Sequence, residues 1–201
     1  MSTNEPEAVV EATARDLGIG ADDVRQLLHF LAPLAAHNVE TYRHSIRVGV
    51  LAARLAQAHG EPGFLALFGG AWHDIGKLDV PDTVLRAERF GDEERHSVER
   101  HAWCGFLRIA GVYYEAGLVA GLHHAFQSRP YGLTPGRYPS QVVRAAQMVA
   151  VCDFYDALVT RKDGRYSEDE RSRPMEIMAQ YYPAHTRWIS WLAAEGPGCL
   201  G

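Results

Sequence analysis

The sequence predicts an all-α protein of about eight helices, and two observations support this. Apolar residues recur at intervals of three and four through most of the chain, as in amphipathic helices, whereas no stretch alternates apolar and polar residues like a half-buried strand. Glycine and proline stand where these patterns stop, as they do at helix ends. With 201 residues, 47% of them hydrophobic, the chain is long enough for one domain with a sizeable core.

The first 38 residues predict two helices without any sign of chemistry. One covers about 5–17, and the next begins at Asp22 or Asp23, with Pro33 expected to kink it or end it early. The apolar stripe of this second helix consists of Val24, Leu27, Leu28, Leu31 and Leu34. We therefore assign residues 1–38 to an N-terminal helical extension, whose stripe makes it a candidate for forming a homodimer or docking a partner.

The remaining helices are expected over most of the later chain. They cover about 39–59, 62–72, 93–110, 113–126 and 141–159, with two more, broken at Pro183, over 168–194. Pro62 is well placed as the first residue of its helix, and the adjacent Gly69 and Gly70 predict a close backbone approach to a neighbouring helix. Residues 83–92 and 127–140 are expected to be connections.

Charge and cysteine content argue against several classes of protein. The net charge of −5 and the pI near 6.0 disfavour a surface for nucleic-acid polymers, although local cations can still hold a small anionic substrate. The three cysteines are scattered, as in a protein of a reducing compartment. The first residues are polar, and no apolar run reaches the roughly 18 residues of a membrane span. We therefore expect a cytoplasmic protein without a membrane partner.

Potential metal ligands begin with the adjacent His73 and Asp74, near an expected helix end. Imidazole and carboxylate together suit a divalent ion such as Fe, Mn or Zn. Glu40 and His44 lie four residues apart and share a helix face, either as ligands or as an ordinary surface pair. One His-Asp pair is common by chance, so its meaning depends on the other candidates.

Three later segments add further candidates. His96 and His101 are five residues apart, so at most one of them should face a common site. The adjacent histidines 123 and 124 stand at a helix end, either as ligands or as a polar end that favours the helix dipole. Asp153 and Asp156 interrupt an apolar helix stretch, where an unpaired carboxylate is costly, so Asp153 should be paired, metal-bound or exposed.

Five short motifs connect these candidates from Glu40 to Tyr166. They are Glu40-x-x-x-His44-Ser45, His73-Asp74-Ile75-Gly76-Lys77 with Pro81-Asp82, Arg100-His101, His123-His124, and Asp153-Phe154-Tyr155-Asp156-Ala157-Leu158. In this order and spacing they resemble the HD superfamily of metal-dependent phosphohydrolases, and most closely its HD-GYP branch of cyclic-di-GMP phosphodiesterases. The resemblance implies an HD-domain helical bundle over 39–195 around a di- or trinuclear metal site. The tail from Gly196 to Gly201 is expected to be disordered.

The resemblance also implies the roles of individual residues. The implied metal ligands are Glu40, His44, His73, Asp74, His101, His123, His124 and Asp153. Asp74 would bridge metals, and a glutamate at position 40 accompanies a third metal in this family. The implied catalytic residues are Asp74 and Lys77, and the candidates for substrate binding are Lys77, Arg47, Arg161, Arg165 and Tyr131. Nitrogen and oxygen ligands without thiolate favour two or three Fe or Mn ions over structural zinc.

The implied function is hydrolysis of a cyclic dinucleotide, with cyclic-di-GMP as the first candidate, by a metal-bridged hydroxide. The chain departs from the family where the base would be read: Ala125 replaces a glutamate, and Pro130-Tyr131-Gly132-Leu133 stands in place of Gly-Tyr-Pro. Residues are added between Pro139 and Asp153, and Gly164-Arg165-Tyr166 replaces Arg-Pro-Tyr. The alternatives are therefore an HD-type phosphohydrolase acting on another nucleotide and a catalytically weak nucleotide-binding signalling module.

Overall fold

The computed structural model describes residues 5–87, 91–160 and 166–199, which form helices joined by turns and loops and contain no strand. The all-α prediction is confirmed for these residues. The α-helices are α1 (Glu5–Asp16), α2 (Ala21–His37), α3 (Val39–Ala58), α4 (Gly63–Trp72), α5 (Asp82–Leu85), α6 (Asp92–Glu99), α7 (His101–Ile109), α8 (Tyr114–Leu122), α9 (Ser140–Thr160), α10 (Glu168–Ser172), α11 (Pro174–Tyr181) and α12 (Thr186–Cys199). The same ranges contain the 3-10 helices η1 (Ile75–Asp79) and η2 (Pro183–His185).

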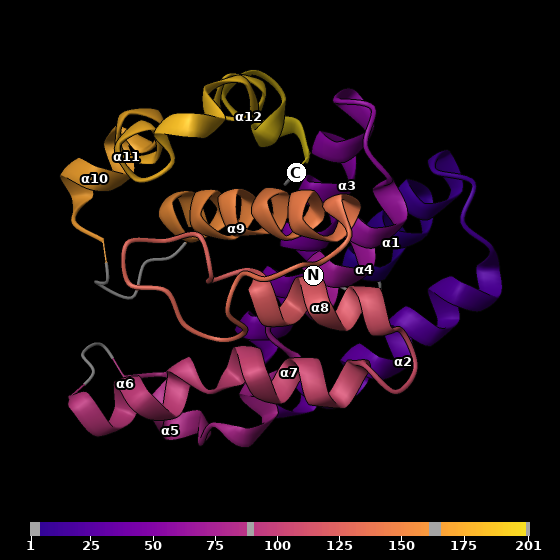
Figure 1. The fold of residues 1–201 in the computed structure, drawn as a ribbon, viewed down its shortest axis with the longest axis horizontal. Coiled ribbons are helices and arrows are strands. Elements are labelled where there is room, and N and C mark those ends of the chain that lie inside the picture. Colours follow the sequence, from indigo (N-terminus) through magenta and orange to yellow (C-terminus); the bar gives the residue numbers. More distant parts are fainter. Residues whose placement is uncertain (1–4, 88–90, 161–165, 200–201) are drawn as a thin grey trace.

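Helix α9 lies at the centre of the molecule. Figure 1 shows it across the middle of the view, with α7 and α8 on one side and α10, α11 and α12 on the other. Helix α3 packs against α4, α9, α1 and α2. Its residues contribute to two groups of buried apolar side chains, one shared mainly with α8 and α9 and the other with α2 and α4. Helices α3 and α9, although far apart in sequence, thus form the middle of one bundle.

The N-terminal helices are part of this bundle. Leu27 and Leu31 of α2 are completely buried in the group that contains Trp72 of α4, and the Trp72 indole N–H donates to the Leu27 carbonyl oxygen (3.1 Å). The apolar stripe that made the extension a candidate for dimerisation is thus used within the chain. Helix α2 also continues through Pro33 to His37, because Leu34, completely buried in the last turn, keeps that turn packed against its neighbours.

Helix boundaries differ from the prediction at two further places. The helix expected over 93–110 is divided into α6 and α7, because the His101 side-chain Nδ1 bonds to the Val98 carbonyl oxygen (2.6 Å) at the end of α6. The connection expected over 83–92 is partly helical, because Pro81 precedes the one-turn α5, and Asp82 accepts from Arg86 four residues later (2.6 Å).

The C-terminal segment contains more helix than expected. The break at Pro183 is confirmed, since η2 begins there, but α10 and α11 are separate because a capping box at Ser167 starts the first and Pro174 starts the second. Helix α12 continues from Gly196 to Cys199, where a disordered tail was expected, because Cys199 is buried against the core. Residues 200 and 201 lie outside the described residues.

Glycines bring α4 close to two neighbours, as predicted. A Cβ atom at Gly69 would lie 2.3 Å from the Cγ1 of Val119 in α8, and one at Gly70 would lie 2.8 Å from the Cα of Gly49 in α3. These distances exclude any side chain larger than hydrogen without a shift. Helix α4 therefore runs tightly between α3 and α8, with His73 directly after its last residue.

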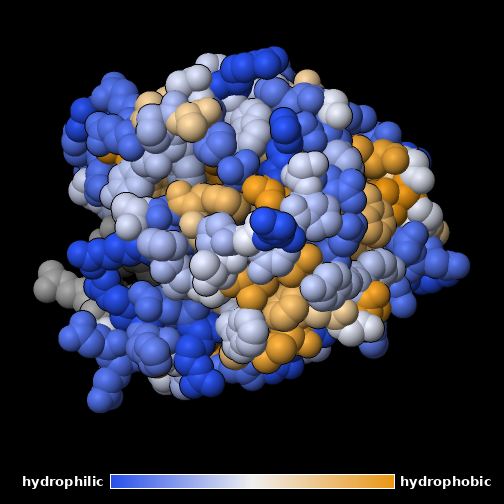
Figure 2. Space-filling model, in the orientation of Figure 1, coloured by the Kyte–Doolittle hydropathy of each residue, from blue (hydrophilic) through white to orange (hydrophobic). Residues whose placement is uncertain are grey.

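The surface combines hydrophilic areas with an apolar face on α7. Figure 2 shows hydrophobic side chains gathered below the centre of the view, where α7 and α8 lie in Figure 1. Trp103 and Leu107 of α7 are 48% and 59% exposed, whereas His101 and Ala102 of the same helix are buried. Among the helices of the described residues, none is both long and apolar enough to cross a membrane.

Candidate metal centre

Three predicted ligands, His73, His101 and His123, each follow a helix end and share one hydrogen-bond pattern. Each Nδ1 lies 2.6 Å from the carbonyl oxygen three residues earlier, in the last turn of α4, α6 or α8. A carbonyl oxygen only accepts, so in the neutral imidazole each Nδ1 carries the proton and each Nε2 keeps a lone pair. The helix ends thereby orient three imidazoles as ligands.

His44, in the second turn of α3, is oriented by a carboxylate instead. Its Nδ1 lies 2.6 Å from Asp156 Oδ2. Burial alone would raise the pKa of Asp156, but hydrogen bonds from His44 and Arg47 lower this pKa to about 2. The ionised carboxylate only accepts, so Nδ1 of His44 donates and Nε2 is available to a ligand.

The Nε2 atoms converge on Asp74. Its Oδ1 is 3.2 Å from Nε2 of His101, whereas its Oδ2 is 3.4 Å from Nε2 of His73 and 3.8 Å from Nε2 of His44. The Nε2 atoms of His101 and His123 are 3.3 Å apart. Asp74 therefore directs one carboxylate oxygen toward each of two sets of imidazoles.

Seven of the eight predicted ligands form overlapping groups whose ligand atoms lie within 4.8 Å of one another. The groups are His44, His73 and Asp153; His101, His123 and His124; and His73, Asp74 and His123, which connects the first two. Asp153 Oδ1 is 2.9 Å from His44 Nε2 and 3.7 Å from His73 Nε2, so this carboxylate lies among the ligand atoms of the first group.

The donor set fits divalent metal ions. Nε2 of His73 and Oδ1 of Asp74 are buried without a hydrogen-bond partner, and the lone pairs of His101 and His123 face each other. Such electron-rich atoms need a cation between them. Neighbouring ligands of an ion bound at about 2.1 Å lie roughly 3 Å apart, which is close to several of the separations here. The groups contain imidazoles and carboxylates without thiolate.

Burial and charge set the protonation of these groups. Burial lowers the pKa of His101 to about 4 and that of His124 to about 3, against the opposing charge of nearby carboxylates, so both imidazoles are neutral near pH 7. Burial would raise the pKa of Asp74, but His73 and Lys77 outweigh it and hold this pKa well below its usual value. Neutral imidazole and ionised carboxylate are the forms that bind metal.

Glu40 is not brought to the cluster. Its side chain is 75% exposed and pairs with Arg43 at 2.9 Å. A role as ligand of a third metal stays a prediction, and it requires the side chain to turn inward. His96 is exposed and His101 is buried, which confirms that at most one of this pair faces the site.

The predicted substrate contacts fall in different places. Lys77 Nζ lies 2.5 Å from Asp74 Oδ2, at the site. Arg47 instead points to Asp156, with Nε 2.7 Å from Oδ1, while Arg161 and Arg165 lie outside the described residues. The Tyr131 ring centroid is 4.2 Å from that of His124, so the loop that departs from the family motif carries an aromatic ring to the ligands.

Asp156 is a site residue that the sequence analysis named in the last motif but gave no role. It is completely buried and contacts a predicted ligand. The available signal was its spacing: it follows Asp153 by three residues on α9, just as Arg47 follows His44 by three residues on α3. One face of each helix thus contributes both a ligand and a residue behind it.

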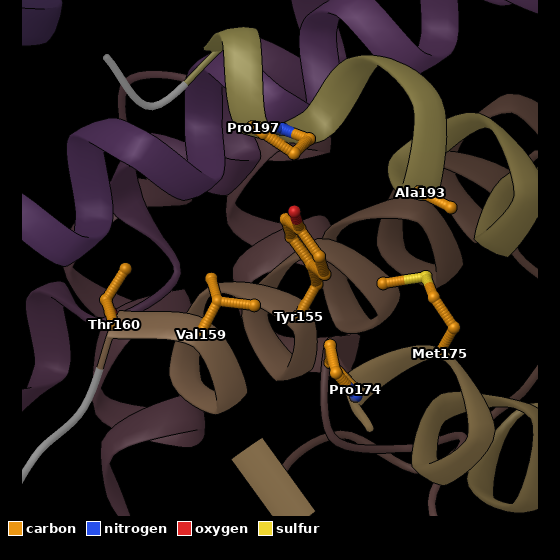
Figure 3. A pocket seen from close by; sticks show the side chains of 7 residues that line it. All are labelled: Tyr155, Val159, Thr160, Pro174, Met175, Ala193 and Pro197. Carbon is orange, nitrogen blue, oxygen red and sulfur yellow. The ribbon is translucent and has the colours of Figure 1, made fainter. Parts of the chain in front are cut away.

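A separate groove of about 450 Å³ lies between α9, α11 and α12 (Figure 3). Its lining residues are Tyr155, Val159, Thr160, Pro174, Met175, Ala193 and Pro197. Figure 3 shows the Tyr155 ring in its middle, directed toward Pro197. None of these side chains is an imidazole or a carboxylate, so the groove is not the metal centre.

Comparisons with known proteins agree with this site. An HD domain model matches residues 41–158. The chain is 28% identical over 163 residues to a cyclic di-GMP phosphodiesterase of Thermotoga maritima (77% of this chain, 44% of that protein) and 34% identical over 164 residues to one of Pseudomonas aeruginosa (77% and 40%). It is 24% identical over 156 residues to a 3'3'-cGAMP-specific phosphodiesterase of Vibrio cholerae (74% and 36%).

The chain spans less than half the length of these three relatives. The family model, in contrast, covers more than half of the chain and includes all seven clustered histidine and aspartate residues. The motif-based expectation is therefore confirmed: the chain belongs to the HD domain family, and its relatives support the HD-GYP branch within it.

Proposed function

We propose that this chain is a metal-dependent phosphodiesterase that hydrolyses a cyclic dinucleotide. The observation that carries the proposal is the position of Asp74, whose two oxygens face two different sets of imidazoles. The residues that would hold the ions are the seven that cluster, with Glu40 as a candidate for a third ion. Divalent ions bound there would supply Lewis acidity and a nucleophilic water at neutral pH, and the ligand set favours iron or manganese.

Lys77 would have two functions in this reaction. Together with His73, its ammonium group lowers the pKa of Asp74 and so favours the ionised form, and it is a cation placed next to this carboxylate. A cation at that point can neutralise charge that develops on a phosphoryl oxygen. The Tyr131 ring, packed on His124, is a surface on which a base can stack.

Cyclic di-GMP is the leading substrate, since two of the relatives named above act on it by name. A specific observation favours a second candidate, 3'3'-cGAMP: the loop around Tyr131 departs from the Gly-Tyr-Pro motif, and a relative specific for that dinucleotide covers 74% of this chain. The two dinucleotides differ in one base, and a change in the loop around Tyr131 would alter which base is accepted.

The test is turnover of both dinucleotides by protein reconstituted anaerobically with Mn(II) or Fe(II), with products separated by chromatography. We expect the parent protein to form a linear dinucleotide only when metal is present. The Asp74→Ala variant should form no linear dinucleotide even with metal. Arg144→Ala, which removes an exposed ion pair with Glu61, is the control and should retain activity.

Other results would select an alternative. Failure to bind metal even after reconstitution would overturn the phosphodiesterase proposal in favour of a nucleotide-binding module. Bound metal with hydrolysis of a nucleoside monophosphate, but of neither dinucleotide, would favour an HD-type phosphomonoesterase.

A further inference from the structure

The four oriented imidazoles differ in what stands behind them. His73, His101 and His123 donate to backbone carbonyls, whereas His44 donates to the buried, ionised carboxylate of Asp156. A carboxylate behind a metal-binding imidazole fixes its tautomer and raises its basicity more than a neutral carbonyl does. The hydrogen bond that orients His44 is therefore stronger than those that orient the other three imidazoles.

The surroundings of Asp156 satisfy the whole carboxylate. Arg47 donates to it in a bidentate manner, from Nε to Oδ1 (2.7 Å) and from Nη2 to Oδ2 (2.9 Å), while His44 donates to Oδ2 (2.6 Å). The Thr160 hydroxyl donates to the Asp156 carbonyl oxygen (2.7 Å) and accepts from Arg47 (3.3 Å). A buried charge is tolerated only when paired in this way. Arg47 thus holds the Asp156 carboxylate in one orientation, and Thr160 in turn binds Arg47.

We infer that Asp156, oriented by Arg47, is a positioning residue that fixes His44 for metal binding in the group with His73 and Asp153. The inference rests on the proposed metal centre and deepens it. His44 and Asp153 lie on different helices, α3 and α9, and the Asp156–Arg47 pair joins the same two helices one turn further along. The pair therefore sets the direction of the His44 ring and also the spacing between the helices that carry the two ligands.

The inference predicts an effect on one ion. The group of His101, His123 and His124 does not contain His44, and the helix-end carbonyls orient His101 and His123. Loss of an outer-sphere partner typically lowers metal affinity by about 10–100-fold. Asp156→Asn removes the charge behind His44 at nearly constant volume, and Arg47, whose side chain is 25% exposed, can then turn toward water.

The experiment is a Mn(II) titration of the chelator-treated protein, with bound and free metal separated by equilibrium dialysis. We expect Asp156→Asn to lower the affinity of one Mn(II) about 10–100-fold and to leave the other unchanged. Arg144→Ala removes an exposed ion pair from the same helix and should change neither. Unchanged affinity for every ion in Asp156→Asn would overturn the inference, whereas no Mn(II) binding by the parent protein would overturn the metal centre itself.

A double-mutant cycle separates positioning from a general structural effect. If Asp156 acts through His44, Asp156→Asn should cause no further loss of Mn(II) affinity in a His44→Ala background. An equal loss of Mn(II) affinity in the parent and in the His44→Ala background would show that Asp156 does not act through His44. Should Asp156→Asn fail to fold, Arg47→Ala takes its place, because it leaves the carboxylate but removes both guanidinium bonds, and the same selective weakening is expected.

Discussion

The carboxylate of Asp74 lies next to two kinds of group, imidazoles and an ammonium group. One oxygen faces His101, and the other faces His73 and the Lys77 ammonium at 2.5 Å. Lys77 is almost buried, so the pair is shielded from water and its charges interact strongly. In the proposed reaction, the ammonium group next to this carboxylate would neutralise charge on a phosphoryl oxygen.

Replacement of Lys77 should separate metal binding from catalysis. We expect Lys77→Met to retain the metal content of the parent protein, because Lys77 is not in any ligand group, and to lower kcat about 10²–10³-fold, as loss of one stabilising charge or donor does. Metal analysis and initial rates on the same samples measure both quantities. Activity within a few-fold of the parent would show that Lys77 has no role at the phosphoryl group.

Residue patterns predicted the clustered ligands but not the residues that orient these ligands by hydrogen bonds. His44, His73, His101, His123, His124, Asp74 and Asp153 could be named because their motifs recur in a known order, and the structure brings these seven together. Asp156 differs, because a carboxylate three residues from a ligand can equally bind metal, support an imidazole or face solvent. Only the contact with His44, 112 positions earlier in the chain, distinguishes these possibilities.

Elements were predictable where the sequence itself ends a helix. The stops at Gly60 and Pro183 follow from backbone limits of glycine and proline and could be read directly. The break between α6 and α7 could not, because the cause is a His101 side chain that binds a backbone carbonyl. The continuation of α2 through Pro33 depends equally on tertiary packing.

The contact between η1 and α7 should tolerate no side chain at Gly76. A Cβ there would lie 1.9 Å from the His101 carbonyl oxygen and 2.6 Å from the Gly105 nitrogen, both backbone atoms. We expect Gly76→Ala to lower the free energy of unfolding by about 1–3 kcal/mol or more and to weaken metal binding, since His101 must move. Urea denaturation measures the first effect. Gly111→Ala, with nothing within 4 Å, is the matched control and should stay within about 0.5 kcal/mol of the parent.

The apolar face of α2 should contribute to the stability of the single chain. Leu27 is completely buried against Trp72, whereas Leu107 on α7 is 59% exposed. Leu27→Ala should therefore cost about 2–5 kcal/mol of unfolding free energy, and Leu107→Ala no more than about 0.5 kcal/mol. If α2 instead serves mainly to pair two copies, Leu27→Ala would change the molecular mass in solution with little loss of monomer stability, which light scattering would detect.

At the scale of the whole molecule, the ligand cluster connects elements that are remote in sequence. It joins α3, the ends of α4 and α8, the start of α7, and α9. The all-α class and the approximate positions of these helices were predictable from periodicity. Their relative placement was not, since it depends on approaches such as Gly70 against Gly49 that a residue pattern does not encode.

Removal of metal should therefore loosen the bundle as a unit. Without an ion, the lone pairs of His101 and His123 and the carboxylate of Asp74 face one another inside the core. Ions at about 1,000 times their dissociation constant stabilise a folded protein by about 4 kcal/mol. A change of 1 kcal/mol in unfolding free energy shifts the melting temperature of a domain of this size by about 2–4 °C. A chelator should therefore lower the melting temperature by about 8–16 °C, and added Mn(II) should restore the original value.

Calorimetry with parallel metal analysis tests this expectation. A His73→Ala, His123→Ala double variant removes a ligand from every group and should melt at the same temperature with and without chelator. If the parent protein lost its metal and still melted unchanged, the ions would bind equally well to folded and unfolded chains. The cluster would then hold metal for chemistry without holding the helices together, and the coupling inferred between α3, α7 and α9 would be wrong.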